Sequence, residues 1–374
     1  MPFGYNFDYL NKDALLQLID FDGQCFTTPS GSRYRVLILD GHCQHMAPAV
    51  TKKLDTLRQQ GAPIFDLRTQ TMAEALKGLQ PDISCDDPTQ LRFVHRECTP
   101  TASANGTFND DNAAIYWICN GLHKARSLDV TFRISGRRPT LWHPETGLVE
   151  PVSYAIRDGL TTVSLHLSPD DAVFVVFQEP TSEQQVVLPE LKKTVVQRIN
   201  TPWTVEFLSD QGDNTGPGKP VVFQQLRSYT ESPEPAIRYY SGTAVYRNTF
   251  QVPHLGTSST PSERWRATMA DEGSRTFLDL GNVGCMAEVF VNGQSVGIVW
   301  KEPYQVDISR ALREGTNELE VHVVNPWANR IIGDQQPDCK QQFTYTPDVF
   351  YRADSPLIPA GLLGPVSIVT FEEQ

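Results

Sequence analysis

The sequence predicts a mixed, mainly β fold with a short α/β layer, a small antiparallel β-sandwich unit and a C-terminal β jelly roll. Strand and helix patterns alternate only at the beginning of the chain, and strand patterns alone follow. The 27 prolines and 25 glycines fit a turn-rich β chain, and 374 residues suit two or three domains. We place the layer at residues 1–95, the β unit at 96–180, a linker at 181–200 and the jelly roll at 201–374.

The α/β layer is predicted from two strand patterns, each followed by a helix pattern. Arg35–Leu39 is an apolar run, as expected for a strand covered on both faces. It is followed by apolar residues at helical spacing, which are Met46, Val50, Leu54 and Leu57. Gly61 is predicted to cap the C-terminus of this helix. Ile64–Leu67 then predicts a second strand and Met72–Leu76 a second helix. The order predicts a parallel layer, similar to flavodoxin and amidotransferase folds, that needs support from its neighbours.

The second unit is predicted from strands separated by turn residues. Val130, Phe132 and Ile134 alternate with polar neighbours, as in a half-buried strand. The four predicted strands are Ile115–Cys119, Leu128–Ile134, Leu160–Leu167 and Ala172–Phe177. The polar stretch rich in Glu, Gln and Lys that follows is the basis for the linker.

The third unit shows the strand pattern of a sandwich or jelly roll. Asn292-Gly293 is the strongest hairpin signal in the chain, because both residues tolerate positive φ. The predicted strands are Trp203–Phe207, Thr243–Val252, Arg275–Leu280, Ala287–Val291, Ser295–Trp300, Glu318–Val324 and Val366–Phe371.

Charge and hydropathy exclude several partners. The formal net charge of −12 argues against nucleic acid, whose affinity depends on basic side chains. The apolar runs are far shorter than the ~20 residues that span a bilayer, so no membrane insertion is expected. Met1–Asn6 shows no signal peptide, so the chain as it stands is expected inside the cell, whereas a longer parent is expected to be exported.

Seven cysteines are spread along the chain without a C-x-x-C pair, which argues against a zinc ribbon. Mostly reduced, buried thiols are predicted, with one or two disulfides in a secreted parent as the alternative. No metal-ligand spacing stands out and no cofactor is expected, while a structural calcium ion in the jelly roll stays open.

Several motifs of the third unit resemble a known sugar-binding domain. The jelly roll of glycoside hydrolase family 2 is similar to Phe277–Gly281, Ala287–Gly297, Pro303–Ile308 and Gly315–Val321. The next segment, Asn325–Asp334, resembles the C-terminal module of the α-L-rhamnosidases of glycoside hydrolase family 106. Upstream segments match the same family: Phe7–Leu15, Tyr34–Leu39 and Phe93–Arg96.

The resemblance implies that catalysis belongs to a different part of the protein. Family members cleave terminal rhamnosides in an α/β barrel N-terminal to these segments, with two glutamates and often a calcium ion. Such a barrel needs ~250 residues, and residues 1–110 show no such series of strand–helix repeats. No catalytic residue is therefore assigned.

The acidic residues of the chain do not single out a new catalytic pair. Two carboxyl groups ~5–10 Å apart, one with a raised pKa, are needed to cleave a glycoside. Solvated surface carboxylates are the prediction for Asp20, Asp22, Asp110, Asp111, Glu145 and Glu150.

Cys43 is a rival candidate for chemistry. It follows a predicted buried strand in the segment Gly41–His45, where amidotransferase-like folds place a nucleophile. His45 replaces the second glycine of such an elbow. A turn before a helix is the alternative that we favour.

Sugar binding by the jelly roll is the activity that the residues favour. Aromatic rings stack on pyranose faces, and planar polar groups bind hydroxyl groups. The candidate residues are Trp300, Tyr304, Asn325, Trp327, Asn329, Arg330 and Asp334. Core packing of the aromatic residues and a structural Arg330–Asp334 ion pair are the open alternatives.

The sequence thus predicts an accessory, non-catalytic C-terminal portion of an α-L-rhamnosidase-like glycoside hydrolase. Its expected partners are rhamnose-containing glycans and a catalytic barrel. A free-standing carbohydrate-binding protein is one alternative. A glycosidase half that needs a separately encoded barrel is the other.

Overall fold

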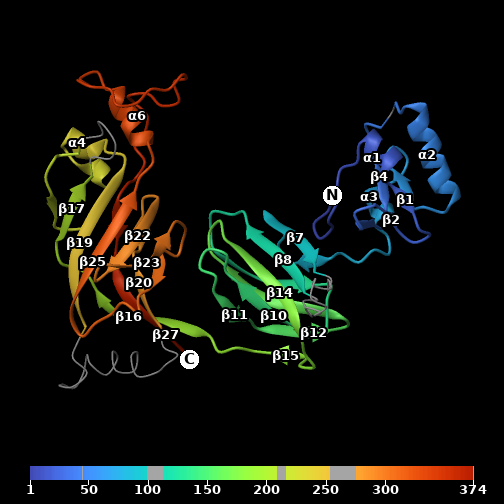
Figure 1. Cartoon of the computed structure of the whole chain (residues 1–374), viewed down its shortest axis with the longest axis horizontal. Helices are drawn as coiled ribbons and strands as arrows, with labels where there is room; N and C mark the ends of the chain where they lie inside the picture. The colour runs from blue at the N-terminus through green and yellow to red at the C-terminus, as the bar shows by residue number, and fades with distance from the viewer. Residues whose placement is uncertain (44, 99–112, 209–215, 253–274, 374) are drawn as a thin grey trace, which may run out of the picture. The chain divides into compact units, whose positions relative to one another are not determined.

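The computed structural model describes residues 1–43, 45–98, 113–208, 216–252 and 275–373. Strands dominate this part of the chain, which confirms the mainly β fold class (Figure 1). Two compact units divide the chain. The first holds the α/β layer and a β-sandwich, and the second holds the jelly roll.

The α/β layer at the N-terminus contains the predicted parallel pair of strands. β4 and β5 run parallel, and helix α2 connects them. A separate antiparallel sheet has the order β1-β2-β3. The bounds are α1 Lys12–Gln17, β1 Asp20–Phe21, β2 Phe26–Thr27, β3 Arg33–Tyr34, β4 Leu37–Leu39, α2 Pro48–Gln59, β5 Ile64–Asp66 and α3 Met72–Ala75.

Local chemistry explains where the helices of this layer begin. The Asn11 side chain accepts a hydrogen bond from the Ala14 backbone N–H and caps α1. Thr71 and Glu74 form a reciprocal capping box at α3. The expectation of a strand covered on both faces is wrong for β4, where only Leu39 is buried. Leu37 and Ile38 line a cavity at the surface of this layer and therefore stay partly exposed.

The sandwich is built from two five-stranded antiparallel sheets, of orders β11-β10-β14-β8-β7 and β15-β12-β13-β9-β6. Its core contains Tyr116, Phe132 and Phe177, whose rings meet edge to face at 4.8–5.9 Å. The bounds are β6 Ile83–Cys85, β7 Leu91–Glu97, β8 Ala114–Asn120, β9 Arg126–Phe132, β10 Arg137–Trp142, β11 Val149–Pro151, β12 Tyr154–Arg157, β13 Leu160–Leu167, β14 Ala172–Pro180 and β15 Gln185–Val186.

The jelly roll packs a four-stranded sheet, β16-β27-β20-β24, on a six-stranded sheet, β18-β17-β19-β25-β22-β23. Strands β21 and β26 form a further pair. The bounds are β16 Leu191–Arg198, β17 Trp203–Phe207, β18 Val221–Phe223, η1 Tyr229–Glu231, α4 Pro235–Arg238, β19 Thr243–Val252, β20 Thr276–Asp279, β21 Asn282–Val283, β22 Met286–Val291, β23 Gln294–Val299, β24 Gln305–Asp307, β25 Gly315–Val324, α6 Ala328–Asp334, β26 Leu362–Gly364 and β27 Ser367–Glu373.

The hairpin predicted at Asn292-Gly293 is present between β22 and β23. Both residues have positive φ, +53° and +78°, which suits the two-residue turn. The Asn292 amide also donates hydrogen bonds to the Ala311 carbonyl and the Asn317 side chain, each at 2.8 Å. The turn is therefore fixed to the rest of the jelly roll.

Two of the expected boundaries differ from the strands that form. Residues 181–200, expected as a linker, contain β15, which pairs with β12, and β16, which pairs with β27. β16 reads as polar because it is an edge strand with mostly exposed side chains. Strand β7 crosses the expected boundary at residue 95 and belongs to the sandwich.

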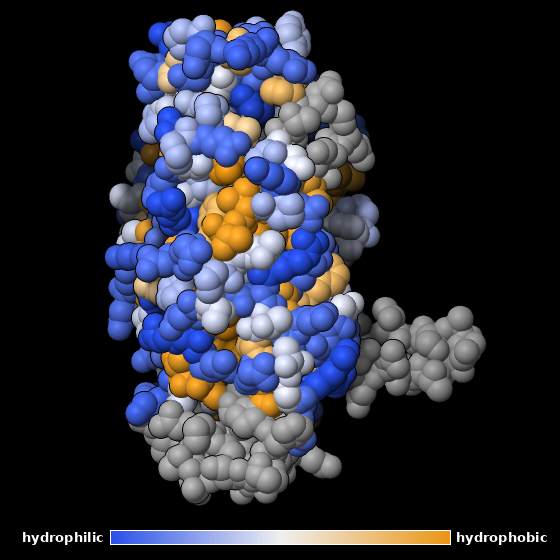
Figure 2. All heavy atoms as spheres, turned by 90° about the vertical axis from the view of Figure 1, so that its left-hand side faces the viewer, coloured by the Kyte–Doolittle hydropathy of each residue, from blue (hydrophilic) through white to orange (hydrophobic). Residues whose placement is uncertain are grey.

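The surface agrees with the composition, whereas the cysteines are less buried than expected. The side of the molecule drawn in Figure 2 is mainly hydrophilic, with small groups of exposed apolar residues. In the part of the chain that the structure describes, no helix is both long and apolar enough to cross a membrane. All seven cysteines lie within the described ranges as free thiols, but each is only partly buried, so the expectation of buried thiols is wrong.

Candidate functional site

The three candidate aromatic residues differ in exposure. Trp300 directly follows β23, and its residue is 56% exposed. Trp327 is the N-cap residue of α6 and is 54% exposed. Tyr304 is partly buried and packs against the jelly-roll core. Only the two tryptophans therefore present much ring surface to solvent.

The two candidate asparagines are buried and bind the backbone of the chain itself. Asn325 donates to the carbonyls of Val323 and Gly242 and accepts from the Gly361 N–H at 2.9 Å. Asn329 donates to the Ile358 carbonyl at 2.7 Å and accepts from the Ile358 N–H at 2.8 Å. These amides thus hold loops and strands of the jelly roll together.

Arg330 and Asp334 form a buried ion pair on α6, one of the alternatives left open by the sequence. Arg330 Nε lies 3.0 Å from Asp334 Oδ1, and the two side chains are 9% and 1% exposed. The other carboxylate oxygen, Oδ2, accepts from the N–H groups of Phe343 and Thr344 and from the Thr344 hydroxyl. The guanidinium also lies over the Phe343 ring, 5.0 Å from its centroid. The pair therefore fixes residues 343–344 to the helix.

Strand register places further apolar residues level with Trp300. Val324 of β25 pairs with Met286 of β22, and Ala287 pairs with Val299 of β23. Trp300 follows Val299, so it continues the row of Val324 and Met286. Their neighbours Val323, Ala287 and Val299 are buried, so side-chain alternation directs Val324, Met286 and Trp300 outward.

The next row of the same outward face is partly polar. Ile298 of β23 pairs with Glu288 of β22, which pairs with His322 of β25. Ile298 is 61% exposed. The His322 ring also contacts the Phe290 ring, with centroids 4.8 Å apart.

Beyond this row an arginine links two carboxylates. Arg247 of β19 donates from Nε to Glu320 at 2.6 Å and from Nη1 to Glu206 at 2.7 Å. Burial acts to raise the pKa of Glu320, but hydrogen bonds from His322 and Arg247 outweigh it, so this pKa is lowered. The carboxylate therefore stays ionised and acts as a hydrogen-bond acceptor. Of this outward face only Trp300 was predicted from the sequence, although the apolar residues at outward positions of the alternating strands were a signal for its apolar neighbours.

Three of the six carboxyl groups considered for catalysis have ion-pair partners. Asp20 pairs with Lys53 at 3.2 Å, Asp22 with Arg33 at 2.7 Å, and Glu150 with His143 at 2.8 Å. Glu145 is an exposed turn residue, and Asp110 and Asp111 lie outside the described residues. Where the pKa of a described carboxyl group departs from its usual range, it is lowered; these groups are Asp22, Asp40, Asp66, Glu74, Asp82 and Glu320.

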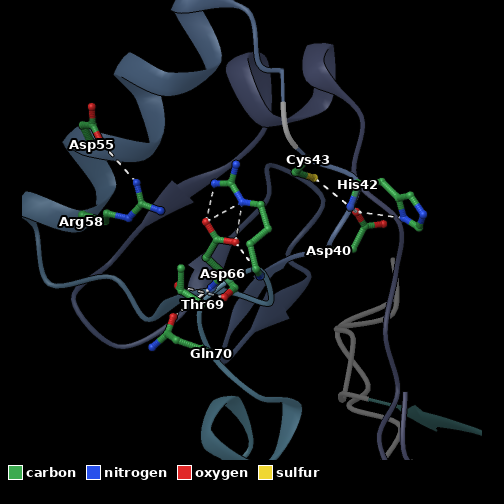
Figure 3. Close-up of polar contacts among 9 residues, drawn as sticks. Asp40, His42, Cys43, Asp55, Arg58, Asp66, Thr69 and Gln70 are labelled. Atoms are coloured by element: carbon green, nitrogen blue, oxygen red, sulfur yellow. Dashed lines mark hydrogen bonds and ion pairs between the residues drawn. The ribbon is translucent and has the colours of Figure 1, made fainter.

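Cys43 lies in the turn after β4, close to a carboxylate (Figure 3). Its thiol donates to Asp40 Oδ1 with the sulfur 3.6 Å from the oxygen. Burial and the Asp40 carboxylate raise the pKa of the Cys43 thiol, which disfavours the thiolate that a nucleophile requires. Nearby, hydrogen bonds from Arg68 lower the pKa of Asp66 to about 2, so the Arg68 charge is paired there. This environment supports the alternative of a structural turn before a helix over a nucleophilic Cys43.

We expect Cys43 to react slowly with iodoacetamide at pH 7.5, and the Asp40→Asn variant to react faster at this site. The substitution removes the negative charge that disfavours the thiolate, so the pKa of the thiol should fall. Peptide mapping by mass spectrometry separates Cys43 from the other six cysteines. An Asp55→Asn variant serves as control, since Asp55 pairs with Arg58 instead. Equal rates in both variants and the parent would contradict the role of Asp40.

Metal ligands do not gather in the described ranges. There, no three His, Cys, Asp or Glu side chains are placed to hold a metal ion.

Comparison with known proteins relates the chain to glycoside hydrolases. Segments 1–71 and 65–156 match the model of the α-L-rhamnosidases of glycoside hydrolase family 106. The structure also matches the solved rhamnosidase from Novosphingobium sp. PP1Y, with a TM-score of 0.79 and 33% sequence identity over 99% of this chain. The chain is a relative of the family 106 α-L-rhamnosidases. The resemblance inferred from the sequence is confirmed.

The jelly roll of this rhamnosidase-like chain has its own match. Residues 232–353 match the galactose-binding domain-like model of glycoside hydrolase family 2. A protein of Formosa agariphila named as a β-glucuronidase is 27% identical over 277 residues, which are 66% of this chain and 22% of that protein. The chain spans 36% of the solved rhamnosidase. Both relatives are therefore much longer than the matched part.

Proposed function

We propose that this chain is an accessory, non-catalytic portion of an α-L-rhamnosidase-like glycoside hydrolase, which binds carbohydrate and supports a catalytic barrel. The observation that carries the proposal is the match to a solved rhamnosidase over 99% of this chain but only 36% of that protein. Rhamnose-containing glycans are the proposed ligands. The barrel is the proposed partner.

The described architecture fits an accessory, non-catalytic role. A catalytic α/β barrel consists of eight parallel strands and ~250 residues. Among the described strands, only β4 and β5 pair in parallel beyond an isolated bridge between Gly281 and Gly364. A glycosidase also needs a carboxyl group with a raised pKa as general acid. Where the pKa of a described carboxyl group is shifted, it is lowered. Such groups suit the roles of hydrogen-bond acceptor and ion-pair partner better than that of a general acid.

The purified chain is expected to release no aryl group from an aryl α-L-rhamnoside above the blank rate, because its described carboxyl groups suit ion pairs. Absorbance of the released phenol measures the rate, and an active α-L-rhamnosidase in the same buffer is the positive control. Steady release that co-elutes with the chain in size exclusion and disappears on heating would overturn the non-catalytic role.

The 56% exposure of Trp300 favours one alternative, a free-standing carbohydrate-binding protein. Such a protein binds glycans without any barrel. A glycosidase half that needs a separate barrel predicts, in contrast, that a barrel added in trans binds the chain and gains rhamnosidase activity. Co-purification and rates with and without the barrel separate the two.

A further inference from the structure

The outward face of β22, β23 and β25 carries an exposed apolar group at one end of the six-stranded sheet. Trp300 and Ile298 are 56% and 61% exposed, and Met286 and Val324 are 39% and 40% exposed. The register puts Val324, Met286 and Trp300 in one row, and Ile298 lies two residues from Trp300 on the same face. Figure 1 shows these strands side by side. We name these four residues the Trp300 face.

Polar side chains border the Trp300 face. Glu288 and His322 lie level with Ile298, and Ser295 donates to the Glu288 carboxylate at 3.0 Å. The ion pair of Arg247 and Glu320 occupies the following row. Charged residues are depleted at the centres of protein–protein interfaces, so this mixture fits a small polar ligand better than a protein partner.

The chemistry of the face matches a sugar with one apolar side. An indole ring is amphipathic and stacks on apolar ligand surfaces, whereas carboxylates and imidazoles bind hydroxyl groups. The residues beside the indole, Met286, Val324 and Ile298, carry only aliphatic or thioether groups. A methyl group is favourable against them, while a hydroxyl group loses hydrogen bonds to water without a partner there.

We propose that the Trp300 face binds a 6-deoxyhexose, with the ring face on the Trp300 indole and the C6 methyl group against the aliphatic residues. The Glu288 carboxylate accepts hydrogen bonds from the ring hydroxyl groups, and the His322 imidazole accepts from them or donates to them. This inference rests on the proposed function and deepens it. It assigns the site to the sheet face instead of the buried polar residues of α6.

Titration of the full chain with two methyl glycosides tests the proposal. Methyl α-L-rhamnoside and methyl α-L-mannoside share their stereochemistry and differ only at C6, where the mannoside carries a hydroxyl group. We expect the rhamnoside to bind about 10-fold tighter, since such a change in an apolar contact is worth ~10–200-fold. Calorimetry or ligand-observed NMR measures both affinities.

Matched tryptophan variants locate the site. Trp300→Ala is expected to weaken rhamnoside binding at least about 10-fold through loss of the stacking surface. Trp142→Ala removes a 38% exposed tryptophan of the sandwich and is expected to leave binding unchanged. Trp327→Ala, at the start of α6, is also expected to leave it unchanged. Circular dichroism confirms that each variant folds.

The possible outcomes separate this inference from the proposed function. Loss of binding only in Trp300→Ala, with preference for the rhamnoside, supports the inference. Equal affinity for both glycosides overturns the deoxy-sugar assignment. Binding that survives Trp300→Ala but is lost in Trp327→Ala overturns the site and leaves the proposed function standing. If neither these glycosides nor rhamnose-containing oligosaccharides bind the parent chain, the inference and the carbohydrate-binding role both fail.

Discussion

Replacing Asp334 with alanine is expected to destabilise the jelly roll by about 3–5 kcal/mol, the usual cost of removing one partner of a buried ion pair. Arg330 would keep its charge in a site where its side chain is 9% exposed. The N–H groups of Phe343 and Thr344 would also lose their shared acceptor, Asp334 Oδ2. Both losses act on α6 and on the segment that it holds.

Hydrogen exchange measured by mass spectrometry resolves this effect, because it reports β19 and β25 separately from the sandwich. The free energy of opening in these strands is expected to fall in Asp334→Ala. Glu206→Gln is the control, since Glu206 forms an ion pair with 42% side-chain exposure and such pairs contribute about 0–1 kcal/mol. Comparable losses in both variants would show that the buried pair contributes no more than a surface pair.

The sequence predicted best the features that depend on neighbouring residues. The Asn292-Gly293 turn needed only two residues that tolerate positive φ, and it forms as expected. The order β4, α2, β5 and α3 also followed from local periodicity. Local signals suffice in these places because the turn or helix is specified within a few residues.

Features that depend on distant partners were missed. β16 appeared to be a linker because only its pairing with β27, at the other end of the jelly roll, makes it a strand. A polar edge strand carries little apolar alternation of its own. Its identity is therefore fixed by tertiary contacts that one sequence does not reveal.

The same distinction between local and distant determinants applies to the candidate site. The residue types of Asn325, Asn329 and Asp334 suit sugar recognition, yet their polar atoms are bound to the chain's own backbone. Side-chain direction and burial decide this, and both follow from packing. The Trp300 face was hidden for a related reason, because its row is assembled by the register of three strands.

Replacing Asp82 with asparagine is expected to destabilise the first unit by about 2–3 kcal/mol at pH 7, as for lost hydrogen bonds to a charged group. The Asp82 side chain is 10% exposed at the edge of the sandwich. It accepts from His95 Nδ1 at 2.8 Å, Arg133 Nη2 at 2.9 Å and the Tyr116 hydroxyl at 3.3 Å. The Asn6 amide adds a longer contact at 3.4 Å. An amide cannot replace a carboxylate toward all of these donors.

The stability cost of Asp82→Asn should shrink as the pH falls. Burial acts to raise the pKa of Asp82, but the hydrogen bond and charge of His95 and the charge of Arg133 outweigh it, so the folded-state pKa lies below the ordinary value of about 3.9. The unfolded chain then binds more protons, and the stabilisation is full above about pH 5 and lost as the pH drops through the folded-state pKa. The free energy of unfolding of the first unit is measured for the parent and for Asp82→Asn at pH 7 and at pH 3, by urea denaturation that is monitored with hydrogen exchange. Asp129 of β9 is an exposed acceptor for the Ser164 hydroxyl, so Asp129→Asn serves as the control and should cost about 0.5 kcal/mol or less at both pH values. A gap between parent and Asp82→Asn that stays constant or widens toward pH 3 would mean that the ionised carboxylate is not what stabilises this edge of the sandwich.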